Sequence, residues 1–287
     1  MTITDQDIIN YYDDCKIDYE LVWHLKSRMA MHYGYWDKDT RNLRQSLTNM
    51  NVKLAELAGI SKDDYVLDAG CGVGGSSIFL AKNIGCKVKG ITLSAKQVEA
   101  ATLNAINNGI SGKATFEINN YSSTNYPDES FDVVWAIESV CHAAEKADFL
   151  REAHRILKKG GRLIMADFFS NSMNHSKDKN NMLNLWAATW AIPEFENIKI
   201  FEEKAAREGF KNIEIHDATK NITPSAFRLH LAFYPGIVVD TFLRLIGQRN
   251  RLQKANVWST YYQYHSLKKG LWSYQIIKGF KGANYEL

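Results

Sequence analysis

Four glycines follow an acidic residue in the segment Asp68-Ala69-Gly70-Cys71-Gly72-Val73-Gly74-Gly75. Residues without a Cβ let the main chain approach a ligand closely, and the N–H groups at the start of a following helix point toward that ligand. The spacing fits the G-x-G-x-x-G turn of dinucleotide-binding proteins poorly. Asp68 either caps the turn or reaches the ligand. The segment therefore predicts a site where backbone groups hold a small molecule.

Polar side chains recur in two later segments, each after a predicted strand. The first is Gly90-Ile91-Thr92-Leu93-Ser94-Ala95-Lys96-Gln97, which lacks the carboxylate that many nucleotide-binding folds use for ribose hydroxyls. Taken alone, it reads as a helix N-cap at Ser94 followed by an exposed Gln97. The second is Glu117-Ile118-Asn119-Asn120-Tyr121. The Asn120 carbonyl can accept a hydrogen bond, and Tyr121 can stack on a base or fill the sheet edge.

A fourth segment ends in two titratable side chains. In the range 131–142, a near-continuous apolar run leads to Glu138 and His142. His142 is the best candidate for a proton acceptor, because the ordinary pKa of an imidazole lies near working pH. Glu138 can balance positive charge that develops on a reacting group. A purely structural role for His142 stays open as the alternative.

Taken together, the four segments resemble the motifs of the Rossmann-like S-adenosylmethionine (SAM) methyltransferases. The glycine-rich run matches their D-x-G-x-G-x-G-G motif, and residues 90–97 are similar to the G-(I/V)-T-L-S-x-x-Q motif of tocopherol, sterol and cyclopropane-type enzymes. Residues 138–142 are similar to an E-S-x-x-H form, whereas Asn120 stands where relatives usually have an acid. The resemblance covers about residues 5–170 and extends weakly to 267–280.

The resemblance implies SAM as the cofactor and assigns residues to it. The segment His32-Tyr33-Gly34-Tyr35-Trp36 looks like the H-x-G-(Y/F) segment that lies over the cofactor in the tocopherol group, with Tyr11, Tyr12 and Tyr19 as further lid candidates. The expected catalytic residues are Glu138 and His142. The expected cofactor-binding residues are Asp68, Gly70, Gly72, Gly74, Thr92, Leu93, Gln97, Asn119, Asn120, Tyr121, Ile137, His142 and Tyr33.

Alternating strand and helix signals from about residue 61 to 169 must position these segments. Because ligands of open α/β sheets bind at the carboxyl ends of the strands, the four segments are expected to meet there. The predicted fold class is α/β, a doubly wound, mostly parallel seven-stranded sheet with a helical N-terminal lid and a helical cap. The predicted organisation is a lid in 1–60, a SAM-binding core in 61–170, and a cap with the last strands in 171–287. Strands are predicted at 65–69, 86–91, 114–118, 131–137, 162–167, 212–216 and 272–280, and core helices at 76–83, 94–108 and 146–157.

The cap region favours an apolar acceptor. Residues 183–192 and 231–243 are rich in aromatic and aliphatic side chains, as pocket linings are, although the same side chains suit packing of the cap on the sheet. Trp186, Trp190, Phe233 and Tyr234 are the expected acceptor-binding residues. We expect methylation, at carbon or nitrogen, of an isoprenoid, sterol-like or aromatic metabolite. N-methylation of a small polar amine, a SAM-dependent cyclisation without methylation and a non-catalytic SAM-binding module remain as alternatives.

Composition narrows the class of protein further. The 287 residues carry a formal net charge of +3 that is spread over the sequence, which disfavours nucleic-acid binding. The four cysteines are scattered without C-x-x-C spacing, so neither a disulfide framework nor a metal site is expected. Neither a signal peptide nor a transmembrane helix is indicated. These features favour a cytoplasmic enzyme that acts on a small molecule.

Overall fold

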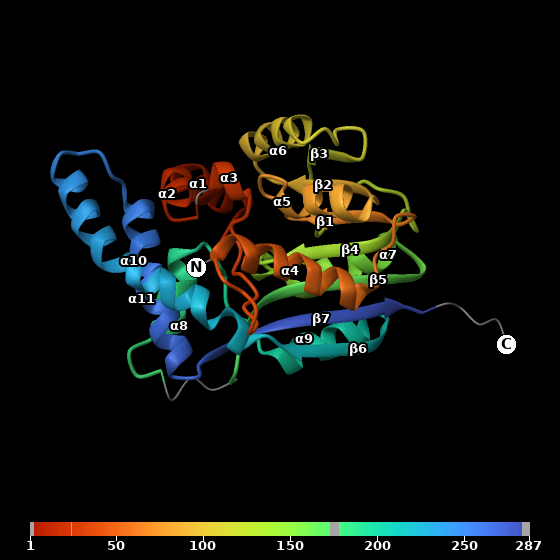
Figure 1. Cartoon of the computed structure of the whole chain (residues 1–287). Helices are drawn as coiled ribbons and strands as arrows, with labels where there is room; N and C mark the ends of the chain where they lie inside the picture. The colour runs from red at the N-terminus through yellow and green to blue at the C-terminus, as the bar shows by residue number, and fades with distance from the viewer. Residues whose placement is uncertain (1–2, 24, 173–177, 283–287) are drawn as a thin grey trace.

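A seven-stranded sheet forms the centre of the computed structural model, which describes residues 3–23, 25–172 and 178–282 (Figure 1). The strand order is β3-β2-β1-β4-β5-β7-β6. Strands β1 to β5 are parallel to one another, and β7 is antiparallel to both of its neighbours. The strands are β1 (Tyr65–Ala69), β2 (Lys87–Thr92), β3 (Ala114–Ile118), β4 (Phe131–Ile137), β5 (Leu157–Ser170), β6 (Phe210–Asp217) and β7 (Trp272–Lys281).

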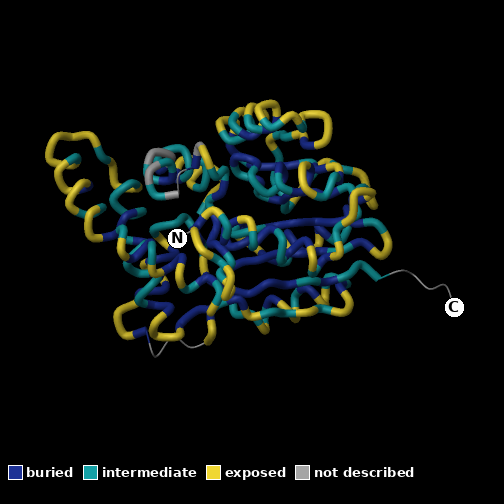
Figure 2. Tube along the Cα trace, viewed as in Figure 1, coloured by how far each residue is buried: buried dark blue, intermediate teal, exposed yellow. Residues whose placement is uncertain are grey.

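Apolar side chains on both faces of the sheet are buried, and Figure 2 shows the central strands as a buried layer. In β4, Val133 and Trp135 belong to one hydrophobic core, and Val134 and Ala136 belong to the other. This alternation explains why a central strand reads as a continuous apolar run. The helices are α1 (Asp5–Asp14), α2 (Lys16–Trp23), α3 (Leu25–Arg28), α4 (Leu43–Ala58), α5 (Gly75–Phe79), α6 (Ala95–Asn107), α7 (Lys146–Ile156), α8 (Met182–Thr189), α9 (Ile198–Arg207), α10 (Thr219–Leu245) and α11 (Arg251–Lys268).

The predicted α/β class and the mostly parallel seven-stranded sheet are confirmed. Several boundaries differ from the prediction by one or two residues, and two differences are larger. The helix predicted from residue 76 is the short α5, which continues as a π-helical turn, η1 (Leu80–Ile84). The strand predicted at 162–167 begins at Leu157 instead, because Leu157 already pairs with Phe131 and α7 ends at Ile156.

The lid and cap helices gather where the parallel strands end (Figure 1). α1, α2 and α3 lie at that edge beside α8, α10 and α11. α4, although it lies within residues 1–60, packs against β5 and β7. The carboxyl ends of β1, β2, β3 and β4 are therefore covered by segments from both ends of the chain.

Candidate cofactor and active site

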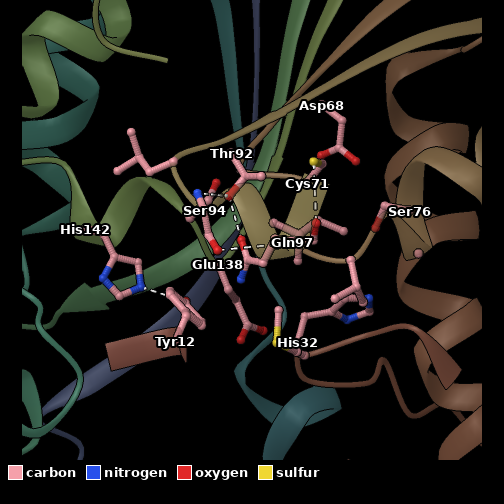
Figure 3. Close-up of a pocket in the computed structure, with 18 of the residues that line it drawn as sticks. Tyr12, His32, Asp68, Cys71, Ser76, Thr92, Ser94, Gln97, Glu138 and His142 are labelled. Atoms are coloured by element: carbon pink, nitrogen blue, oxygen red, sulfur yellow. Dashed lines mark hydrogen bonds between the residues drawn. The ribbon is translucent and has the colours of Figure 1, made fainter. Parts of the chain in front are cut away.

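A pocket of about 910 Å³, its open mouth included, lies at the carboxyl ends of the parallel strands (Figure 3). The four segments that follow β1, β2, β3 and β4 form its floor and walls, and α1 together with residues 29–32 forms its roof. Of the residues predicted from the sequence, those on the wall are Asp68, Gly70, Gly72, Thr92, Leu93, Gln97, Asn119, Tyr121, Ile137, Glu138 and His142. That these residues hold SAM stays a prediction.

The glycine-rich turn needs its glycines for two different reasons. Gly70 and Gly72 both have left-handed backbones, with φ of 93° and 52°. A Cβ on Gly70 would lie 2.4 Å from the Cβ of Ser139, so this glycine lets the ends of β1 and β4 approach. A Cβ on Gly72 would meet only the terminal methyl of Met31, at 2.9 Å. The space beside the Gly72 Cα therefore belongs to the pocket and is not filled by the protein core.

Asp68 ends β1 beneath this turn and is buried. Its Oδ2 accepts a hydrogen bond of 2.6 Å from the hydroxyl of Ser77 in α5. Burial raises the pKa of the carboxyl to about 6, and the bond from Ser77 opposes that rise. Asp68 thus stabilises the turn and also lines the pocket. The two roles predicted for it, capping the turn and reaching the ligand, are therefore compatible.

After β2, Thr92 and Gln97 contact each other at the pocket wall. The Thr92 hydroxyl donates to Gln97 Oε1 over 2.5 Å, which fixes the Gln97 amide. Ser94 caps α6 as predicted, with its Oγ accepting from the Gln97 N–H at 3.3 Å. The Ser94 hydroxyl also donates to Asp13 of α1 at 3.1 Å. The N-terminal lid is therefore anchored to the second motif.

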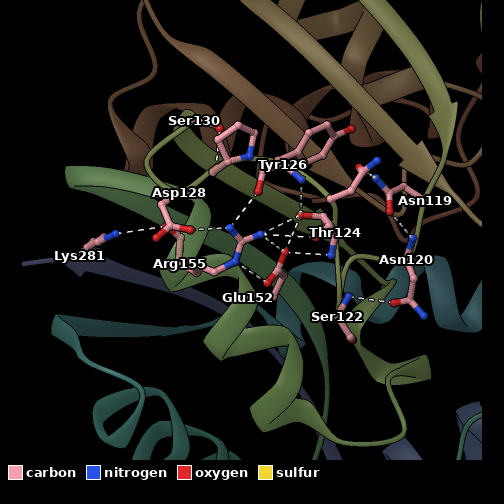
Figure 4. Close-up of polar contacts among 12 residues, drawn as sticks. Asn119, Asn120, Ser122, Thr124, Tyr126, Asp128, Ser130, Glu152, Arg155 and Lys281 are labelled. Carbon is pink, nitrogen blue, oxygen red and sulfur yellow. Dashed lines mark hydrogen bonds and ion pairs between the residues drawn. The ribbon is translucent and has the colours of Figure 1, made fainter.

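The loop after β3 is held from outside the pocket by α7 (Figure 4). Arg155 donates to the Tyr126 carbonyl at 2.8 Å and forms ion pairs with Asp128 and Glu152. Within the loop, Asn119 Oδ1 accepts from the N–H of the next residue at 2.9 Å. These contacts keep the Asn119 end of the loop in the pocket wall.

Glu138 lies at the end of β4 with a left-handed backbone, φ 50°, which a residue with a Cβ rarely adopts. Its Oε1 accepts hydrogen bonds from the Tyr33 N–H at 2.7 Å and from the Tyr274 hydroxyl at 2.8 Å. Burial raises the pKa of Glu138 well above its ordinary value, and the two hydrogen bonds offset part of that rise. A cation bound beside Glu138 would favour its ionised form.

His142 is buried at the pocket wall and contacts the lid. Its Nδ1 lies 3.2 Å from the Ala191 carbonyl, which can only accept, so Nδ1 carries the proton of the neutral ring. Nε2 is then the acceptor for the Tyr12 hydroxyl, 2.9 Å away in α1 (Figure 3). Burial lowers the pKa of His142 to about 4. At neutral pH the residue is therefore a neutral imidazole with its lone pair directed at the lid.

A buried pair of charged groups holds the short turn that carries His142, η2 (Val140–His142). Asp167 accepts from the Cys141 N–H at 2.8 Å, and the Lys146 ammonium donates to the carbonyls of Cys141 and Ala143. Because each buried polar group has a partner here, the turn is fixed relative to β5 and α7. The position of the imidazole is thus set by β5 and α7.

The structure places His32, and not Tyr33, in the pocket. Tyr33 is fully buried behind the wall, where its hydroxyl donates to Gln263 of α11 and its ring stacks on Trp272. His32 Nδ1 donates to the Tyr33 carbonyl at 2.8 Å, which leaves a lone pair on Nε2. Within the described part of the chain, this buried Nε2 has no hydrogen-bond partner. Burial lowers the pKa of His32 to about 4.

Several other predicted residues do not reach the pocket. Gly74 precedes α5, and Asn120 donates from Nδ2 to Asp5 of the lid at 3.0 Å. Trp186 and Trp190 pack against each other and against Phe168. Phe233 packs on Trp258, and Tyr234 is half exposed on α10. Packing therefore accounts for Trp186, Trp190 and Phe233, Tyr234 lies largely at the surface, and none of the four lines the pocket.

The roof contains Tyr12, one of the predicted lid residues, together with residues that the motif analysis did not select. Ile8, Ile9 and Tyr12 of α1 line the pocket, as do Met29 and Met31. The spacing of Ile8, Ile9 and Tyr12 puts them on one face of a helix, which was the available signal. Among the described residues, no group of three or more His, Cys, Asp or Glu side chains is arranged to hold a metal ion. The same part of the chain contains no helix long and apolar enough to cross a membrane.

Residues 67–165 match the family described as "Methyltransferase domain". The chain is 38% identical over 138 residues to 27-O-demethylrifamycin SV methyltransferase of Amycolatopsis mediterranei, a match that covers 48% of this chain and 51% of that protein. It is 33% identical over 214 residues to 2-methyl-6-phytyl-1,4-hydroquinone methyltransferase of a Synechocystis species, covering 70% of this chain and 64% of the relative. Tocopherol O-methyltransferases and sterol 24-C-methyltransferases also match.

Among solved structures, the [4+2]-cyclase SpnF superposes with a TM-score of 0.79 and 22% identity over 98% of both chains, a likeness of fold. Fold, pocket and sequence match agree on the class of protein. Residues 67–165 are a methyltransferase domain, and the chain carries the Rossmann-like fold of the SAM-dependent methyltransferases, whose cofactor is SAM. The resemblance to the tocopherol and sterol enzymes is confirmed by relatives of both kinds. The chain spans about half the length of the rifamycin relative.

Proposed function

We propose that this protein transfers a methyl group from SAM to a small, largely apolar acceptor. One observation carries the proposal: a single pocket joins the glycine-rich turn to Glu138 and His142 beneath α1 and residues 29–32. In such a pocket, cofactor and acceptor would meet out of contact with water, and alignment of the two can supply much of the rate.

The residues present fit SAM, because Gly72 leaves a space that a Cβ would fill. The backbone around Gly70 and Gly72 would hold the methionine part, with Gln97 fixed by Thr92 toward the ribose hydroxyls. Asn119 and Tyr121 would flank the adenine. When bound, SAM supplies an electrophilic methyl group on a positively charged sulfur. Glu138 would balance the positive charge that develops on the acceptor as the methyl group is transferred.

At the other end of the pocket, the neutral imidazole of His142 would accept a proton from the acceptor. Ile8, Ile9 and Ile137 line the same pocket, and their apolar side chains suit an isoprenoid, sterol-like or aromatic acceptor. A carbon or nitrogen acceptor remains our expectation. An acceptor hydroxyl would also suit proton removal by His142, and one similar protein is a 27-O-demethylrifamycin SV methyltransferase.

The test is mass spectrometry of small molecules from a cell extract incubated with the protein and methyl-labelled SAM. We expect label in apolar products, and His142→Ala to retain SAM binding while losing roughly 10²–10⁴-fold in turnover if proton removal is needed. Unchanged turnover with reduced thermal stability would make His142 structural.

Three other outcomes would replace the proposal. Label confined to small polar amines would give the amine N-methyltransferase. An acceptor converted to an isomer of equal mass would indicate a cyclase, which the shared fold permits. If titration calorimetry detects no binding of SAM or of its demethylated product, the protein does not use SAM.

A further inference from the structure

The helices α10 and α11, with the turn between them, form a hairpin (residues 219–268) that projects from the body of the molecule (Figure 1). Figure 2 shows the outer end of this hairpin as largely exposed. α11 contacts α8, β7 and α1, and the N-terminal half of α10 contacts β7 and α2, whereas the C-terminal half of α10 extends beyond them. It is therefore the part of the chain that another surface would meet first.

One face of α10 is apolar although it is exposed. Its apolar residues recur at spacings of three and four, which aligns them along one side of the helix. The exposed fraction reaches 68% for Val238 and 82% for Leu245. We call the following residues the hairpin face: Phe227, Leu231, Tyr234, Val238, Val239, Phe242, Leu245, Ile246 and Leu252. A contiguous exposed surface of this kind marks an interaction site.

The charged side chains of the hairpin are almost all positive. Residues 219–268 contain seven Lys or Arg and a single acidic residue, Asp240. Asp240 is fully buried and forms an ion pair with Arg249. Arg244 and Arg251, which flank the turn, are exposed. Although the net charge of the whole chain is small, the projecting hairpin carries an excess of positive charge beside its apolar face.

We propose that the hairpin face docks on the surface of a lipid bilayer that carries anionic headgroups. Apolar side chains of an interfacial helix enter the boundary between headgroups and acyl chains, and nearby cations attract anionic lipids. Docking needs no helix that spans the bilayer. A second copy of this chain fits the face less well, because a two-fold contact through the hairpin tips would bring Arg244 and Arg251 near their own equivalents.

The turn of the hairpin, residues 246–250, is linked to the lid of the pocket. Arg249 forms an ion pair with Asp18 of α2 at 2.5 Å, and Asn250 donates to Asp14 of α1 at 2.8 Å. α1 also supplies Tyr12 to the pocket roof. A bilayer docked on the hairpin face would therefore lie next to the lid. The docking proposal itself does not depend on which acceptor is methylated.

The experiment is flotation of the full-length protein with vesicles of phosphatidylcholine, alone or mixed with phosphatidylglycerol. We expect binding to the mixed vesicles and weaker binding in high salt, because screening reduces attraction at exposed charges. Phe242→Glu with Leu245→Glu should abolish the binding. The matched control is Leu103→Glu with Ile106→Glu on α6, where exposed fractions of 56% and 57% are comparable. This control should bind like the unmodified chain.

A second pair of variants tests the charge. Arg244→Gln with Arg251→Gln should weaken binding to the mixed vesicles by roughly 30-fold, since each cation near an anionic surface contributes about 1 kcal/mol. Lys62→Gln with Lys87→Gln, both exposed and remote from the hairpin, is the control. Retained SAM affinity in all four variants would show that they are folded.

Three results would overturn the proposal. The first is equal flotation with neutral and mixed vesicles, or with neither. The second is equal loss of binding in the α6 control. The third is a dimer in analytical ultracentrifugation that the Phe242→Glu and Leu245→Glu changes dissolve, which would assign the hairpin face to a second copy of the chain.

Discussion

Gly72 is the residue at which ligand binding and folding can be separated. Its Cβ position is open apart from the mobile end of Met31, so Gly72→Val should abolish or strongly weaken SAM binding while the sheet still forms. Gly59→Val is the matched control, because Gly59 has a similar φ of 59° but no atom within 4 Å of its Cβ position. Both changes add the same kind of backbone strain, about 1–3 kcal/mol.

Titration calorimetry with SAM and thermal unfolding measure the two effects. We expect only Gly72→Val to lose affinity, and both variants to lose similar stability. Equal SAM affinity in the two variants would contradict a cofactor seat at Gly72. Gly70 does not serve this purpose, because its Cβ would collide with Ser139 and disturb the sheet itself.

At the scale of elements, α7 supports the pocket without touching it. Arg155 connects α7 to the loop 119–130, which brings Asn119 and Tyr121 to the pocket wall (Figure 4). Arg155→Ala leaves Glu152 and the Tyr126 carbonyl without this donor, so the loop should order only when SAM binds. An ordering cost of about 1–2 kcal/mol would raise the dissociation constant for SAM about 5–30-fold.

The control is Arg151→Ala, one turn earlier on the same helix. Arg151 is 61% exposed and pairs with Asp148 and Glu208, which do not belong to the loop. Titration calorimetry should find SAM affinity unchanged in this variant. If Arg151→Ala and Arg155→Ala weaken binding equally, the effect arises from the helix as a whole and not from the loop.

At the scale of the whole molecule, buried titratable groups oppose one another in their effect on stability. Burial lowers the pKa of His32 and His142 to about 4 from 6.5, so their contribution to stability is present above pH 6.5 and lost toward pH 4. Burial raises the pKa of Asp68 and Asp167 to about 6 from 3.8. Their contribution is present below pH 3.8 and lost as the pH rises through 6.

We therefore predict that Asp68→Asn steepens the pH dependence of stability. Without one opposing carboxyl, the gain in unfolding free energy between pH 4.5 and pH 6.5 should increase by roughly 1–3 kcal/mol. Urea unfolding at the two pH values measures the gain. Asp63→Asn, at an exposed position, should behave as the unmodified chain does. A gain that shrinks in Asp68→Asn would reverse the sign of the argument.

Most of the strands, and the segments that follow them, could be predicted from the amino-acid pattern. β1, β3 and β4 have the predicted bounds, because burial on one or both faces leaves a periodic apolar pattern in the chain. The glycine-rich turn and the Ser94 N-cap could also be predicted, because the local backbone conformation restricts which residue types fit there.

Packing between segments far apart in the chain determines which side chains of the lid and cap face the pocket. Tyr33 turns to Gln263, 230 positions along the chain, and leaves the pocket to its neighbour His32. Trp186 and Phe233 became core, while the apolar run around Val238 became surface. No local pattern separates an apolar side chain that packs from one that binds or stays exposed. Whether such a side chain is buried depends on which distant elements pack beside it, and the local periodicity of the sequence does not indicate those elements.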